Sequence, residues 1–122
     1  MNLNVPYNVQ QAIRNASVKT GVPEDLLTAF AYIESGFAQD VIEGKRRSHT
    51  QVRGLFQITG STWKLARKLS NNPNERTLGY SLDINEQAYT AALLIRDLLQ
   101  KYNNLISIKS IKHSNNIRKF FK

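Results

Sequence analysis

One stretch of regular apolar spacing constrains the fold more than any other feature of the sequence. Between Asp83 and Tyr102, apolar residues recur at spacings of three and four, which is the period of one buried helix face. These residues are Ala88, Ala91, Ala92, Ile95, Leu98, Leu99 and Tyr102. Asp83 followed by Glu86 has the spacing of a capping box, so the helix should begin there. This is the longest and most regular helix that the sequence predicts.

Two shorter helices are predicted near the N-terminus. The first covers residues 7–20 and ends at Gly21, which suits a left-handed terminal position. Pro23 fits the first turn of the second helix, because its missing N–H costs nothing there. This helix should finish between Glu34 and Gly36, and its expected buried face consists of Leu26, Leu27, Phe30 and Ile33.

A further helix and several irregular segments complete the prediction. Thr59 or Ser61 should cap a third helix with Trp63, Ala66 and Leu69 on its inner face, and residues 71–74 (NNPN) should break it. Residues 39–53 have no helical period and indicate an exposed loop. Residues 103–122 are basic and too apolar for a solvated tail, yet they keep no single period, so their role stays open. The sequence therefore predicts a mainly α single domain over residues 1–122.

Composition excludes several kinds of site. The chain has 122 residues, enough to bury about 68% of the surface that the unfolded chain exposes. It contains no cysteine, which removes thiol nucleophiles, disulfides and thiolate metal ligands. Its two histidines, His49 and His113, lie far apart, so no metal site and no cofactor are expected.

The net charge of +8 comes from 17 basic and 9 acidic residues. Such a charge attracts polyanions, which include nucleic acid, teichoic acid and the anionic bacterial envelope, although it can also serve solubility alone. The N-terminal residues lack the basic cluster and apolar run of a signal peptide, and no stretch approaches the ~20 apolar residues of a membrane span. If the target lies outside the cytoplasm, we expect that a phage carries the protein, that another route delivers it, or that a leader peptide has already been removed.

Glu34 is the candidate catalytic residue. It lies in residues 31–37 (AYIESGF), at the predicted C-terminal end of a helix, where the helix dipole disfavours a second negative charge. Apolar neighbours at Tyr32, Ile33 and Phe37 would also favour the neutral carboxyl. A carboxylic acid that holds its proton near neutral pH is what protonation of a glycosidic oxygen requires. The alternative is an ordinary solvent-facing glutamate at a helix end.

A second motif follows Glu34 after the polar loop. Residues 54–59 read GLFQIT, and Gln57 lies 23 residues beyond Glu34 with apolar neighbours on both sides. A buried amide needs hydrogen-bond partners, and an N-acetyl or hydroxyl group of a sugar could supply them. Alternatively, Gln57 caps a neighbouring helix and has only a structural role.

Taken in order, these two motifs resemble the soluble (SLT) type of lytic transglycosylase, whose catalytic domain is related to goose-type lysozyme. Residues 21–27 (GVPEDLL) look like the run that leads into the catalytic helix of that family, and residues 82–88 (LDINEQA) look like its entry to the next core helix. The resemblance covers roughly residues 8–102. It implies a lysozyme-like domain with a substrate cleft that acts on peptidoglycan in the bacterial envelope.

The resemblance also implies a mechanism with a single carboxyl group. Glu34 would protonate the oxygen between N-acetylmuramic acid and N-acetylglucosamine. It would then act as a base toward the muramic acid C6 hydroxyl, which closes a 1,6-anhydro ring. The residues implied to contact substrate are Ser35, Ser48, Gln57, Ile58, Tyr80 and Tyr102.

The sequence departs from the family pattern in two places. The gap between Glu34 and Gln57 is about five residues longer than in common members, and the basic run 45–49 fills it; Ser48 would stand in for a serine of that loop. The later Ala-Tyr-Asn-Ala-Gly motif, whose tyrosine supports the acid, is missing. Tyr80, Tyr89 or Tyr102 would have to take that role.

Two other functions fit parts of the sequence. A lysozyme-type hydrolase would cut the same bond with water and need a second carboxylate, for which Asp40 and Glu43 are available. A non-catalytic module would bind peptidoglycan or nucleic acid through its basic C-terminal residues, with Phe120 and Phe121 stacking on bases. No nucleic-acid-binding motif is visible, so nucleic acid is not the expected partner.

Overall fold

A computed structural model describes residues 4–46 and 52–121, with side chains described for 4–46 and 52–106. The element order is α1 (Tyr7–Thr20), α2 (Glu24–Ser35), α3 (Gln39–Ile42), α4 (Gly60–Arg67), the short 3-10 helix η1 (Pro73–Glu75) and α5 (Ile84–Phe121). Within the described ranges, the β pairing is an isolated bridge between Arg53 and Ile58. The prediction of a mainly helical chain is confirmed.

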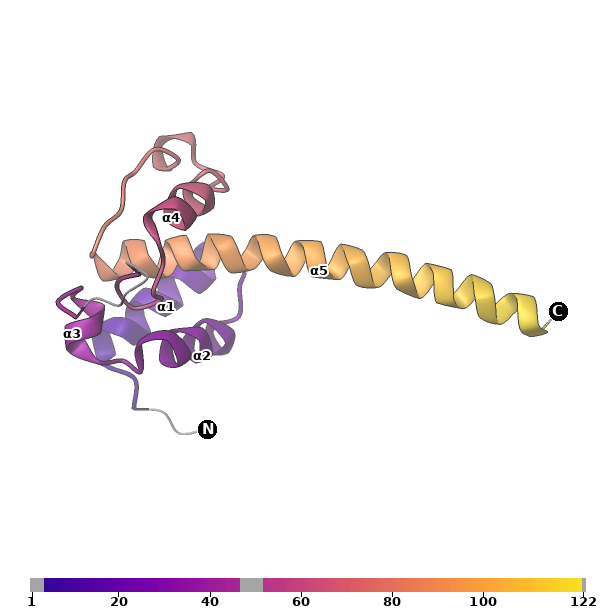
Figure 1. The fold of residues 1–122 in the computed structure, drawn as a ribbon, viewed down its shortest axis with the longest axis horizontal. Helices are drawn as coiled ribbons and strands as arrows, with labels where there is room; N and C mark the ends of the chain where they lie inside the picture. The colour runs from indigo at the N-terminus through magenta and orange to yellow at the C-terminus, as the bar shows by residue number, and fades with distance from the viewer. Residues whose placement is uncertain (1–3, 47–51, 122) are drawn as a thin grey trace.

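Helix α5 is the central helix, and the other helices lie on both sides of it. Figure 1 shows α4 and η1 on one side of α5 and α1, α2 and α3 on the other, while the C-terminal part of α5 extends well beyond the other helices. Three alanines of α5 (Ala88, Ala91 and Ala92) are buried, and their small side chains let α1 pack closely against it. The core joins them to residues of α1, α2 and the 55–58 segment.

The helix ends follow the signals in the sequence. Gly21 (φ 79°) and Gly36 (φ 60°) adopt left-handed conformations and donate their N–H groups to the carbonyls of the last turns of α1 and α2. Thr59 caps α4 by accepting a hydrogen bond from the Thr62 N–H. Asp83 accepts one from the Glu86 N–H at the start of α5. These caps explain why the predicted helix boundaries are accurate.

Several sequence-based expectations about burial are wrong. Helix α2 buries Leu27, Ala31 and Ser35, whereas Phe30 is 40% and Ile33 74% exposed, and Leu26 is half-buried. Apolar residues surround most of α2, so its sequence alone does not reveal which face meets the core. Residues 39–42 form the short helix α3 and are not part of a loop.

The long apolar stripe of α5 is only partly buried. Ala88, Ala91 and Ile95 contact the core, but the stripe continues past the end of its neighbours to Leu98 and Tyr102, which are exposed. The segment 103–121, whose structure the sequence left open, continues the same helix. No helix in the described part of the chain is long and apolar enough to cross a membrane.

A buried arginine fixes the α4–η1 region to α5, and the sequence analysis missed it. Arg67 has no solvent exposure. Its Nε donates to the Glu75 carbonyl (2.9 Å), and its Nη1 donates to Glu86 Oε2 (2.8 Å) and Thr90 Oγ1 (3.1 Å). A buried guanidinium with these partners holds three elements in one arrangement.

Candidate active site

Glu34 lies in the last turn of α2, one residue before the helix ends, and it is exposed. The sequence predicts apolar surroundings for its carboxyl, but Tyr32 and Ile33 are themselves exposed. The rings of Tyr32 and Phe37 lie 5.6 Å apart on the flanks of the motif. These neighbours therefore do not enclose the carboxyl, and that expectation is wrong for the free protein.

Ser35 is buried directly beside Glu34. Its hydroxyl donates to the Ala31 carbonyl (2.8 Å) and accepts a hydrogen bond from the Phe37 N–H (3.3 Å). Phe37 has a positive φ of 59°, as does Gly36, so the chain reverses sharply after the helix. The Ser35 hydroxyl thus closes the end of α2 and steadies the turn behind Glu34, while the sequence predicts a substrate contact for it.

Gln57 lies in a tight turn that the Arg53–Ile58 bridge closes. Its backbone N–H and its side-chain Nε2 both donate to the Gly54 carbonyl, at 3.2 and 2.9 Å. Its φ of 51° is unusual for a residue with a side chain and costs about 1–3 kcal/mol. Such strain is typical of functional sites, where the surrounding structure holds a residue in an unfavourable conformation. The amide does not cap a helix, contrary to the structural alternative.

Gln87 ties the turn to the region that follows Glu34. Its buried Oε1 accepts a hydrogen bond from the Leu55 N–H (2.6 Å), and its Nε2 donates to the carbonyls of Leu82 (2.7 Å) and Ile42 (3.5 Å). Ile42 belongs to α3, seven residues after Ser35. One amide therefore connects the Gln57 turn, and α3 after the Glu34 motif, to the start of α5.

Gly54 fits against this amide because it has no side chain. Its φ is 86°, and a Cβ at this position would overlap Gln87 Oε1 and lie 2.9 Å from Gln87 Cδ. The sequence analysis did not identify Gln87. A signal was present, because a glutamine beside Ala88 on a buried helix face needs a hydrogen-bond partner for its amide. Gly54 and Gln87 together hold in place the turn that carries Gln57.

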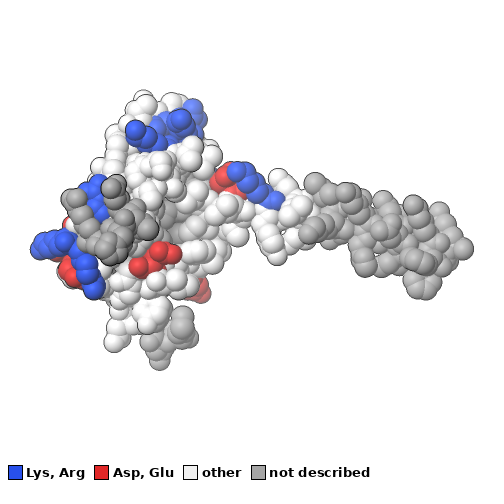
Figure 2. Space-filling view, in the orientation of Figure 1, with Lys and Arg blue, Asp and Glu red and all other residues white. Residues whose placement is uncertain are grey.

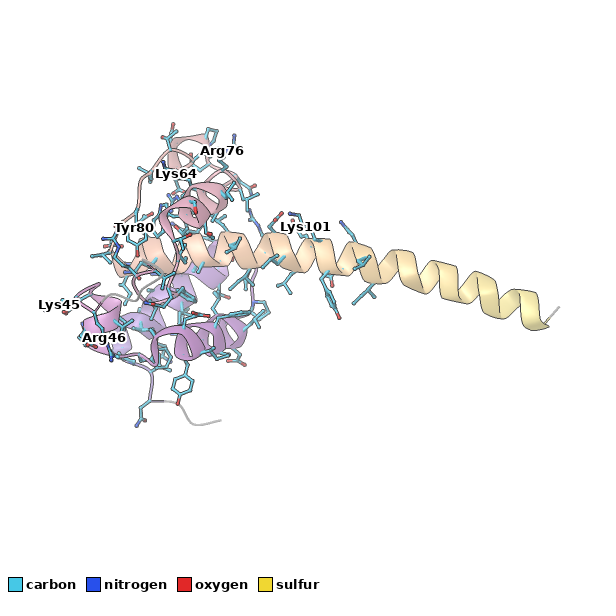
Figure 3. The ribbon with its side chains drawn as sticks, viewed as in Figure 1. Lys45, Arg46, Lys64, Arg76, Tyr80 and Lys101 are labelled. Atoms are coloured by element: carbon cyan, nitrogen blue, oxygen red, sulfur yellow. The ribbon has the colours of Figure 1, made fainter. Side chains whose placement is uncertain are left out.

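Tyr80 supports the same turn next to Gln87. Its hydroxyl donates to the Arg53 carbonyl (2.9 Å), its ring packs on Trp63 (centroids 4.8 Å apart), and the Arg53 guanidinium lies 4.7 Å from the ring centre. Burial raises the pKa of Tyr80, and the nearby Arg53 charge partly opposes this. Figure 3 shows Tyr80 beside the first turns of α5. Tyr80, Gln57 and Ile58 are therefore brought together around Arg53.

The other predicted site residues do not join this group in the described structure. Tyr102 is exposed on the extension of α5, and Tyr89 is buried against Arg67, with its hydroxyl 2.8 Å from Ser70 Oγ. Ser48 lies outside the described residues. Of the three candidates for the supporting tyrosine, Tyr80 is the one that contacts a candidate motif.

The two candidate second carboxylates are engaged in ion pairs near α3. Asp40 Oδ2 lies 3.0 Å from Arg46 Nε, and Glu43 Oε2 lies 2.8 Å from Lys45 Nζ. A hydrogen bond from Gln39 and then the Lys45 contact lower the pKa of Glu43. Figure 3 shows Lys45 and Arg46 at the end of α3. Both carboxylates are therefore paired with neighbouring basic side chains.

The arrangement offers one exposed carboxyl on α2 and a strained amide turn, and both segments are anchored in the same core. Ala31 of the Glu34 helix and Leu55 and Ile58 of the turn belong to the same core cluster, and Phe37 packs against it. In the part of the chain that the structure describes, no three His, Asp or Glu side chains could hold a metal ion. The depressions lined by Gln10, Tyr89 and Arg96 do not include Glu34, and the substrate cleft stays a prediction.

Comparison with known proteins gives one match. Residues 11–116 match the family model described as the transglycosylase SLT domain, which spans both motifs, the Gln87 contact and most of α5. No curated protein and no solved structure is significantly similar to the chain.

Proposed function

Because the chain belongs to the transglycosylase SLT domain family, we propose that it is a lytic transglycosylase that cleaves peptidoglycan between N-acetylmuramic acid and N-acetylglucosamine. One observation supports the proposal most directly. The helix that carries Glu34 and the turn that carries Gln57 both pack into one core, and both lie within the residues that match the family. The substrate is the glycan strand of the envelope, and the net charge of +8 would favour approach to its anionic polymers.

Glu34 supplies the proton in this proposal. Its position at an exposed helix end lets a polymer approach from solvent, and a bound strand would exclude water from the carboxyl. The proton passes to the glycosidic oxygen as the bond to the muramic acid C1 breaks, and the substrate's own N-acetyl group stabilises the positive charge. Glu34 then accepts the proton of the C6 hydroxyl, whose oxygen bonds to C1. No water is consumed, and Glu34 ends the cycle protonated.

Gln57 and Ile58 position the strand in this scheme. The Nε2 of Gln57 donates a hydrogen bond to the Gly54 carbonyl, and in this proposal its Oε1 accepts a hydrogen bond from the sugar. Tyr80 holds the Arg53 backbone under that turn and would act through the turn. Ser35, Ser48 and Tyr102 remain predicted contacts.

The substitution Glu34→Gln, which keeps the size of the side chain but removes its acidic proton and its charge, tests the assignment. We expect a folded protein that loses at least about 100-fold in rate, the usual scale of a general acid. Glu24→Gln, in the first turn of the same helix, is the matched control and should keep its activity. Mass spectrometry of digested peptidoglycan should give anhydromuropeptides. A Glu34→Gln variant within a few-fold of the unmodified protein would refute the role of Glu34.

The hydrolase is the second candidate, and the same digestion distinguishes it because a hydrolase leaves reducing ends. Loss of activity in Glu43→Gln or Asp40→Asn would support it, since a hydrolase needs a second carboxylate. The ion pairs of both residues with Arg46 and Lys45 argue against that role. A protein that binds peptidoglycan without degrading it would instead be a non-catalytic module.

A further inference from the structure

The extension of α5 carries an apolar face that the other described residues do not cover. Four large apolar residues on it are exposed: Leu98 (54%), Tyr102 (60%), Leu105 (49%) and Ile106 (42%). Their spacings of four, three and one place them on one side of the helix. They continue the stripe that Ala91 and Ile95 bury against the core. The apolar stripe that α5 packs against the core therefore continues along the extension, where its residues are exposed to solvent.

The length of the extension makes this exposure notable. From Leu98 to Phe121 the helix runs for about 36 Å at 1.5 Å per residue, and Figure 1 shows it leaving the body of the molecule. Helices in proteins owe most of their stability to the packing of an apolar face. A partner surface that covers the stripe would stabilise the extension.

The charge of the extension indicates which kind of partner surface would cover its apolar stripe. After Asp97 the sequence contains six basic residues and no acidic one: Lys101, Lys109, Lys112, Arg118, Lys119 and Lys122. Asp97 itself pairs with Lys101 (2.8 Å). In Figure 2 the visible surface of α5 just beyond that pair is uncharged. A basic segment with an apolar stripe suits a partner that offers anionic groups above an apolar layer.

We propose that the extension of α5 lies along the surface of an anionic lipid bilayer, with Leu98, Tyr102, Leu105 and Ile106 toward the acyl chains. An anionic bilayer combines negative headgroups with apolar depth, as this segment requires. A second copy of the chain would bring two segments of like charge together, which opposes pairing. A purely polar polyanion would leave the apolar stripe exposed.

Sedimentation with lipid vesicles tests the proposal on the full chain. Vesicles of phosphatidylcholine alone are compared with vesicles that contain phosphatidylglycerol as well. We expect at least about tenfold tighter association with the anionic vesicles, and this preference should weaken as salt is added. Equal or absent binding to the two vesicle types would overturn the proposal. Because no peptidoglycan is present, the outcome is independent of the proposed enzymatic function.

A pair of double variants localises the binding. Leu105→Glu with Ile106→Glu removes two residues of the stripe and should weaken association with anionic vesicles at least about tenfold. Val18→Glu with Leu65→Glu makes the same change of charge at two exposed apolar positions elsewhere and should bind more tightly than the first pair. Equal loss in both pairs would overturn the proposal, as would a stable dimer that only the α5 variant loses. Circular dichroism checks that both variants keep their helix content.

Discussion

The contact between Gly54 and Gln87 gives the most direct test of how the site is held. Gly54 combines two independent constraints: a φ of 86° and no space for a Cβ, which would overlap Gln87 Oε1. That oxygen accepts the buried Leu55 N–H at 2.6 Å. Replacement of Gly54 by alanine should therefore strain the backbone and also push the Gln87 amide away from Leu55.

The expected cost can be assembled from these two effects. A left-handed conformation costs an L-residue about 1–2 kcal/mol relative to glycine. A buried N–H that loses its partner costs about 1–3 kcal/mol. Gly54→Ala should thus lower the free energy of unfolding by about 2–5 kcal/mol, a large fraction of the 5–15 kcal/mol of a typical domain. In a thermal melt this corresponds to a fall in Tm of roughly 8–20 °C.

Two other glycines separate the effects in the same assay. Gly21 has a φ of 79° but nothing within 4 Å of a Cβ, so Gly21→Ala should lose only the conformational part, about 1–2 kcal/mol. Gly60 lies in the first turn of α4 with an open surrounding, so Gly60→Ala should be neutral or slightly stabilising. Urea denaturation of the three variants gives the comparison. If Gly54→Ala is no less stable than Gly21→Ala, the amide does not fix the turn as argued.

Two further predictions concern the cap of α4 and the alkaline limit of stability. Thr59→Ala removes the acceptor of the Thr62 N–H and should lower the free energy of unfolding by about 1 kcal/mol in urea denaturation, whereas Thr77→Ala at an exposed position should change little. An equal effect of both would contradict the capping role. Burial raises the pKa of Tyr89 above its ordinary value of 10.0; the hydrogen bond with Ser70 opposes this in part, and Glu75 adds to it. The native state therefore holds this proton more tightly than the unfolded chain, so the contribution to stability is complete below about pH 10 and is lost as the pH rises through the native pKa. Urea midpoints measured between about pH 9 and 11 should fall less steeply for Tyr89→Phe, and an unchanged slope would contradict the assignment.

Local signals in the sequence determined the positions of α1 and α2 and the starts of α4 and α5, but not α3 or the C-terminal end of α5. Gly21, Gly36, Thr59 and Asp83 end or cap helices through interactions with residues at most four positions away. Such contacts form wherever the helix forms, so they can be read without knowledge of the fold. The order of the two candidate motifs was also visible in the sequence, and with it the family.

The buried faces and the supports of the site could not be predicted in the same way. Whether Phe30 and Ile33 or Leu27 and Ala31 meet the core depends on how α2 is rotated against its neighbours. The exposure of Glu34 follows from that rotation.

The contacts beneath the candidate site are equally long-range. Gln87 reaches Leu55 across 32 positions of the sequence and Ile42 across 45. The sequence by itself fixed the period and ends of its helices, because those depend on residues within one turn of each other. Only the tertiary structure decided which side chains are buried and which amide holds the Gln57 turn, because hydrogen bonds between distant segments exist only once the helices have packed.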